Sequence, residues 1–180
     1  MEVNAFLLLK KIREKHGPHE FGKVAQKLFA IALCRLNFIV KERCSQDVDI
    51  EAVKADLKYW FEVKTTDKDA VAIGEKDVRC LEQCRRLHGG ITGYAILKLS
   101  ILSDWIVASS NNIHPGEVAI SRFAPQAVQP LQEQIIRIFP AIVRDYGNEI
   151  VAVKKSEAQN VTTKFFIKEL EKAIVSPRRN

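Results

Sequence analysis

Hydrophobic residues in the first part of the chain recur every three or four positions, which is the spacing of amphipathic helices. One apolar stripe covers residues 2–14, and a second covers residues 18–36. Gly17 and Pro18 separate the two stripes, and a proline is well tolerated in the first turn of a helix. The pattern therefore predicts two helices that are separated at Gly17.

The spacing changes after residue 37 to the alternation that is typical of strands. Residues 48–53 and 59–64 alternate apolar and polar side chains, and residues 54–58 between them suit a turn. This stretch predicts a hairpin in the middle of the chain. Further strands are predicted at residues 38–40, 93–99 and 105–108.

Helical spacing returns in three later segments. Glu75–His88 is followed by Gly89 and Gly90, which commonly end a helix. Two more helices are expected within residues 130–146 and 161–174. Together the elements predict an α/β fold, with a mixed core over residues 1–110 and a mostly helical extension over residues 111–180.

Composition and charge narrow the class of protein. The chain has 180 residues, 47% hydrophobic and 28% charged, as is usual for a globular domain. It has no apolar run near the roughly 18 residues that span a bilayer, so we expect a cytoplasmic protein without membrane contact. The net charge of +6 makes DNA or RNA the first candidate among acidic partners, although many proteins with this charge bind no polyanion.

The chain has four cysteines, and we expect them to be reduced thiols that pack in the interior. Cys80 and Cys84 lie one helical turn apart, so both could face one metal ion. Zinc sites usually combine matched and more closely spaced cysteine pairs, and the sequence has no second pair. The other two cysteines are Cys34 and Cys44.

The predicted hairpin carries the residues with the clearest chemistry. Residues two apart in a strand share a face, so Glu62 and Lys64 lie together on one strand. If Val53 pairs with Lys58, Asp49 faces Glu62 across the hairpin, with Cβ atoms about 4.5–5.5 Å apart. Two carboxylates at that distance repel each other.

This repulsion makes sense if a cation sits between the two acids. The cation is either the Lys64 ammonium or a divalent ion such as Mg²⁺, which prefers carboxylate oxygens. The alternative interpretation is an acidic hairpin that is simply exposed to solvent, in a register that the pattern does not fix to the residue.

Asp49, followed thirteen residues later by Glu62-Val63-Lys64, resembles the motif of the PD-(D/E)XK nuclease superfamily. The upstream helix with Glu20 and the order of the predicted elements are also similar. Within the superfamily, residues 18–100 look most like the archaeal Holliday junction resolvases and their restriction-enzyme relatives. Val48 stands where some members have proline, and the resemblance does not extend to the last 70 residues. The resemblance implies a restriction endonuclease-like core, with helices around a central mixed sheet.

The resemblance also implies roles for the motif residues. Asp49, Glu62 and the backbone carbonyl of Val63 would hold Mg²⁺, for which Mn²⁺ can substitute. Lys64 would orient the attacking hydroxide or neutralise charge in the transition state. Glu20 would approach the metal directly or through water; alternatively, it is a solvated acid in the first turn of a helix.

Other polar residues near the motif suit contacts with DNA phosphates. In the alternative interpretation, the hydroxyl groups at the end of the third predicted strand have no role in binding, and the polar residues on the following helix form a surface that is simply exposed to solvent. The predicted nucleic-acid-binding residues are Thr65, Thr66, Arg79, Gln83, Arg85 and Arg86.

The sequence therefore predicts a Mg²⁺-dependent endodeoxyribonuclease, either junction-resolvase-like or restriction-like, without a small-molecule cofactor. Resolvases act as dimers, so a homodimer on DNA is expected, with residues 111–180 serving for DNA contact or dimerisation. The first alternative is a catalytically silent nucleic-acid-binding or assembly module that kept the nuclease fold. The second is an unrelated α/β protein with a chance motif, in which Asp49 and Glu62 would lie far apart.

Overall fold

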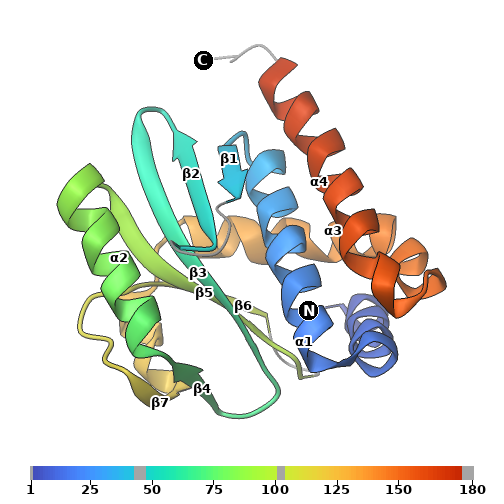
Figure 1. Ribbon diagram of the computed structural model, residues 1–180, viewed down its shortest axis with the longest axis horizontal. Coiled ribbons are helices and arrows are strands. Elements are labelled where there is room, and N and C mark those ends of the chain that lie inside the picture. Colours follow the sequence, from blue (N-terminus) through green and yellow to red (C-terminus); the bar gives the residue numbers. More distant parts are fainter. Residues whose placement is uncertain (1, 43–47, 101–103, 176–180) are drawn as a thin grey trace.

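A five-stranded mixed sheet forms the centre of the computed structural model, which describes residues 2–42, 48–100 and 104–175 (Figure 1). The strand order is β1-β2-β3-β5-β6, in which β3 and β5 are parallel and the other neighbours are antiparallel. The strands are β1 (Ile39–Glu42), β2 (Ile50–Lys54), β3 (Leu57–Thr66), β5 (Ile91–Lys98) and β6 (Trp105–Ser109). The predicted mixed sheet is confirmed.

The β2–β3 hairpin has the register that alternation predicts. Val53 pairs with Lys58, and Glu51 pairs with Trp60. The turn consists of Ala55 and Asp56, both with positive φ angles, 48° and 65°, as a tight two-residue hairpin turn requires. This register places Asp49, which directly precedes β2, next to Glu62 and Val63 of β3.

Three helices cover one face of the sheet. They are α1 (Val3–Arg35), α3 (Leu131–Ala152) and α4 (Ala158–Val175). As predicted, α1 is interrupted at Gly17, whose φ of 83° a residue with a side chain rarely adopts. Phe29 of α1 joins these layers, with its ring 5.4 Å from Phe61 of β3 and 4.9 Å from Trp105 of β6. The main hydrophobic core thus lies between this face and the three helices.

Helix α2 (Glu75–His88) covers the opposite face together with a short ribbon of β4 (Ala70–Ile73) and β7 (Gly116–Ala119). The bounds of α2 agree with the predicted helix. Trp60 of β3 stacks on His88 of α2 and donates a hydrogen bond from its indole to the carbonyl of Gly89. The ribbon was not predicted, and β7 lies within residues 111–180, which were expected to be mostly helical.

A partly buried polar network ties the last two helices to the end of α1. The guanidinium of Arg35 donates to Asp145 of α3 at 2.8 Å and to Glu169 of α4 at 3.2 Å, and Tyr146 donates to Glu169 at 2.5 Å. Burial opposes the charge on Glu169, yet the hydrogen bonds from Lys172, Tyr146 and Arg35 lower its pKa to about 2. Residues 131–175 are therefore anchored to α1 by charge as well as by apolar packing.

No helix within the described part of the chain is long and apolar enough to cross a membrane. Cys34 and Cys84 are buried thiols and Cys80 is half-buried, which agrees with the expected packing role. Cys44 lies outside the described residues.

Candidate active site

A cleft of about 340 Å³ opens between α1 and the N-terminal end of α2, where residues of the β2–β3 hairpin form its floor; we call it the α1–α2 cleft. In Figure 1 the two helices lie on either side of these strands. The cleft is lined by His19, Gly22, Lys23 and Gln26 of α1, by Asp49, Glu62, Val63 and Lys64 of the hairpin, and by Lys76 and Asp77 of α2. The structure thus brings the predicted Asp49, Glu62, Val63 and Lys64 together.

Asp49 and Glu62 are in direct contact on the floor of the cleft. Their carboxyl groups share a hydrogen bond, and the Val63 N–H donates to Asp49 Oδ2 at 2.8 Å. Gln26 of α1 donates to the backbone carbonyl of Asp49 at 3.3 Å. Only 6% of Glu62 is exposed, although it is a charged residue type. The predicted meeting of the two acids is confirmed.

The environment makes both acids hard to ionise. Burial, followed by the negative charge of Asp49, raises the pKa of Glu62 to about 8, and the Lys64 ammonium offsets only part of this rise. Burial also raises the pKa of Asp49, against the opposing effects of the Val63 N–H and of Lys64. The shared hydrogen bond raises the pKa of Glu62 and lowers that of Asp49.

The Lys64 ammonium does not bridge the two acids, contrary to one of the two arrangements expected for the hairpin. Its Nζ lies 2.6 Å from Oδ2 of Asp77, in the first turn of α2. The same Asp77 oxygen accepts a hydrogen bond of 2.9 Å from the N–H of Gly74, the residue that caps α2. The Lys64 ammonium is the nearest positive charge on the hairpin, and it forms its ion pair with Asp77. The negative charge of the Asp49–Glu62 pair is therefore only partly compensated.

Asp77 lines the cleft and contacts Lys64, and the sequence analysis did not single it out. A signal was available, because an acid at the third position of a helix commonly caps its N-terminus. The cleft residues of α1 could also have been recognised: His19, Gly22, Lys23 and Gln26 follow helical spacing and therefore share one side of the helix.

Glu20 lies outside the set of residues that line the α1–α2 cleft. Its carboxylate pairs instead with Lys23, at 3.1 Å, and lies 3.9 Å from Nε2 of His19. Glu20 therefore lies beside two residues that line the cleft, Lys23 and His19, and does not itself line it.

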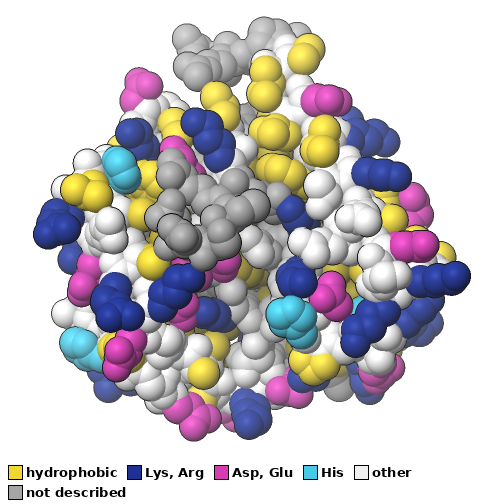
Figure 2. Space-filling view, viewed as in Figure 1, with side chains coloured by type: hydrophobic (Ala, Val, Ile, Leu, Met, Phe, Trp, Pro, Cys, Tyr) yellow, Lys and Arg dark blue, Asp and Glu magenta, His cyan; other side chains and the backbone are white. Residues whose placement is uncertain are grey.

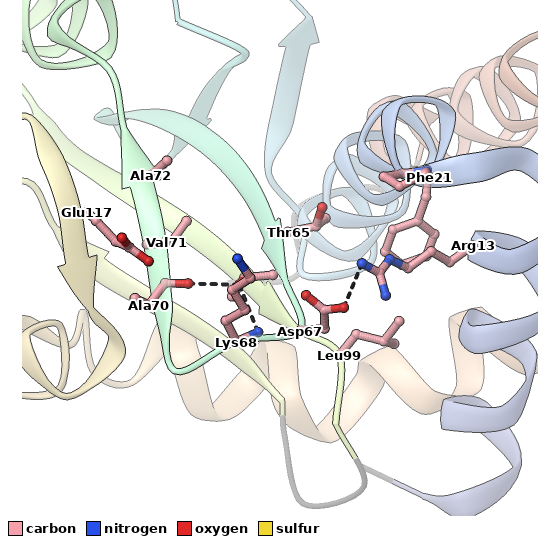
Figure 3. A pocket seen from close by; sticks show the side chains of 12 residues that line it. Arg13, Phe21, Thr65, Asp67, Lys68, Ala70, Val71, Ala72, Leu99 and Glu117 are labelled. Atoms are coloured by element: carbon pink, nitrogen blue, oxygen red, sulfur yellow. Dashed lines mark hydrogen bonds and ion pairs between the residues drawn. The ribbon is translucent and has the colours of Figure 1, made fainter.

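Thr65 and Thr66 line a different pocket, of about 240 Å³, beside the turn between β3 and β4 (Figure 3). Thr66 donates from its hydroxyl to the carbonyl of Ala70 and accepts from the N–H of Lys68, so it stabilises that turn. Across the pocket, Arg13 of α1 forms an ion pair of 2.8 Å with Asp67. The contacts of Thr66 therefore agree with the alternative interpretation, in which its hydroxyl stabilises the end of the strand.

The predicted binding residues of α2 are exposed but do not line the α1–α2 cleft. Arg85 lies on the side of α2 away from it and donates to Asn111 at 2.8 Å, in a third pocket that Tyr94 also lines. Gln83 is seven residues from Lys76 and so shares the cleft side of the helix. The other two, Arg79 and Arg86, are exposed on α2.

The donor atoms at Asp49 and Glu62 fit a divalent cation. The two carboxyl groups are buried together, their charges are poorly compensated, and Mg²⁺ prefers such oxygens. Within residues 2–42, 48–100 and 104–175, however, no group of three or more His, Cys, Asp or Glu side chains is placed to hold a metal ion. A metal here would bind to two side chains and complete its shell from a backbone carbonyl and water.

Comparison with known proteins supports the fold. No protein-family model matches the sequence, and no curated protein matches it. Among solved structures, the chain is similar to Hjc of Archaeoglobus fulgidus, described as a Holliday junction resolvase from an archaeal hyperthermophile. The TM-score is 0.54 and the identity 14%, over 63% of this chain and 94% of the resolvase chain. The expected resemblance is thus confirmed at the level of the fold: over 63% of its length, this chain has a fold similar to that of an archaeal Holliday junction resolvase.

Proposed function

We propose that this protein is a metal-dependent DNA endonuclease that hydrolyses phosphodiester bonds in the α1–α2 cleft. The observation that carries the proposal is the contact between Asp49 and Glu62, with Lys64 on the next inward-facing position of the same strand. A buried acid pair costs stability unless something compensates it, and a cation that also contacts DNA would do so. The resolvase-like fold is the second support.

Each residue of the cleft has a part in this proposal. Asp49, Glu62 and the carbonyl of Val63 would hold Mg²⁺ or Mn²⁺. When bound, the ion would supply a polarised phosphate and an acidified water. The Val63 N–H and Gln26 fix Asp49 in place, and Lys64 carries the positive charge that would orient the nucleophile or stabilise the developing charge at phosphorus.

The remaining basic groups of the cleft suit the phosphates on either side of the cut. Lys23 and His19 lie on the α1 wall, and Lys76 lies on the α2 wall. Figure 2 shows Lys and Arg side chains spread over this face among Asp and Glu side chains, without one continuous basic patch. We therefore propose recognition of DNA through contacts near the cut rather than through a broad basic surface, with Arg79 and Gln83 as further candidates on α2.

A homodimer is also proposed, on the resemblance to resolvases. A candidate surface for it lies at the C-terminal end of α4, where hydrophobic side chains gather (Figure 2). Ile174 and Val175 there are 62% and 78% exposed, and Ile167 is 47% exposed. Exposed apolar groups of this kind are typical of interaction surfaces. In this proposal residues 111–180 serve dimerisation.

The experiment that tests the proposed function compares DNA substrates of equal length with 5 mM Mg²⁺ or Mn²⁺: linear duplex, single strand, flap and four-way junction. We expect the four-way junction to be cut fastest, by about tenfold or more over linear duplex. Paired cuts on opposite strands of one junction would indicate two active sites that act together. Equal cutting of junction and duplex would favour a restriction-like enzyme. DNA binding without cleavage would contradict the proposal and favour the silent binding module.

A further inference from the structure

The carboxylate of Asp77 makes two contacts through one oxygen atom. Oδ2 accepts the N–H of Gly74 at 2.9 Å and lies 2.6 Å from Nζ of Lys64, so it joins the first turn of α2 to the catalytic strand β3. The Asp77 side chain is 17% exposed and that of Lys64 is 25% exposed, so water screens this ion pair less than it would at the surface. The position of the ammonium therefore depends on the start of α2.

Asp77 has no evident part as a metal ligand. Its Oδ2 is already engaged by an ammonium and an amide, and among the described side chains no three acids converge on one point. Its negative charge also disfavours the ionised forms of Asp49 and Glu62. If Asp77 serves the site, it serves it through Lys64.

Lys64 needs a partner that holds its ammonium group in place, because its side chain is flexible. Lys64 carries its charge on a flexible four-carbon chain, and the nearby acids Asp49 and Glu62 both interact with that charge. An ammonium that moved on to these acids would take the place of the cation that they are proposed to hold. The contact with Asp77 holds the ammonium to one side of them.

On the proposed function, we propose that Asp77 is a positioning residue: it holds the Lys64 ammonium beside the acid pair and keeps it from competing with the divalent cation. Gly74 contributes to this arrangement, because a Cβ at that position would lie only 3.3 Å from Asp77 Oδ2. The acid would then have to shift, and with it the lysine.

A double-mutant cycle on Mn²⁺ affinity tests the proposal, with titration calorimetry as the readout and no DNA present. Asp77→Asn removes the charge but keeps an oxygen that can cap α2, and Lys64→Gln removes the competing ammonium. We expect Asp77→Asn to weaken Mn²⁺ binding roughly five- to tenfold when Lys64 is present, and by less than about twofold in the Lys64→Gln background. Glu75→Gln, which removes an exposed acid from the same helical turn, is the matched control and should change the affinity by less than about twofold.

Each result of the cycle decides between defined outcomes. Equal weakening by Asp77→Asn with and without Lys64 would overturn the positioning role, because Asp77 would then act on the cation directly or through the helix. No effect of Asp77→Asn in either background would also overturn it. If the unmodified protein does not bind Mn²⁺, the proposed metal site is wrong. This result is distinct from equal effects of Asp77→Asn in the two backgrounds, which would contradict only the positioning role of Asp77. Circular dichroism spectra that coincide for all variants would exclude loss of α2 as the cause.

Discussion

Glu62→Gln is expected to lower metal-dependent DNA cleavage by about a hundred- to a thousandfold or more. Glutamine keeps the size and one hydrogen-bonding oxygen of the side chain, but it removes the charge that a divalent cation requires. Loss of a single group that stabilises charge at a reaction centre typically has an effect of this size. The measurement is the single-turnover rate of cleavage on the substrate that the unmodified protein cuts fastest.

The matched control for this variant is Glu133→Gln, an exposed acid on α3 that lies outside the α1–α2 cleft. It should cleave at the rate of the unmodified protein. Equal rates for Glu62→Gln and the unmodified protein would mean that the activity comes from a contaminating nuclease, and that Glu62 has no catalytic part.

The second large effect concerns the pH dependence of stability in metal-free protein. The pKa of Glu62 is about 8 in the folded state and about 4.5 in the unfolded state, so between these values the folded protein binds more protons. The free energy of unfolding should therefore fall as pH rises, by about 3 kcal/mol between pH 5.5 and 8.5 from this group alone. This sign is opposite to that of an acid stabilised by an ion pair, such as Glu169.

Urea unfolding in the presence of EDTA measures this effect. Because other groups also titrate, the informative quantity is the difference between the unmodified protein and Glu62→Gln at each pH. We expect the variant to gain stability relative to the unmodified protein as pH rises, because its amide cannot ionise. A pH-independent difference between the two proteins would show that Glu62 ionises normally and that its burial does not matter.

Alternation along the hairpin was sufficient to predict the central part of the site. The face that Trp60, Glu62 and Lys64 share is buried under α2 or lines the cleft, and a one-residue slip would have placed these residues against the α1 core. Strong apolar patterning therefore determined the register, and the register brought Asp49 to Glu62. The two glycines after His88 likewise set the end of α2.

The partner of Lys64 could not be deduced from the hairpin, because it comes from a helix whose orientation depends on tertiary packing. Asp77 reaches Lys64 only because Leu81 and Cys84 of α2 pack on the sheet and set the rotation of the helix. The same rotation turns Arg85 away from the cleft. Glu20 was assigned by the resemblance alone, and on α1 it lies one residue beyond His19, which does line the cleft.

The central claim is that Asp49 and Glu62 form a binding site for a divalent cation, and a thermal-denaturation titration with Mn²⁺ tests it most directly. A ligand that binds only the folded state raises the melting temperature as its concentration rises above the dissociation constant. The account predicts such a rise for the unmodified protein and for Asp69→Ala, whose side chain is 93% exposed, and no rise for Asp49→Ala. A rise that is undiminished in Asp49→Ala would place the cation elsewhere and contradict the account.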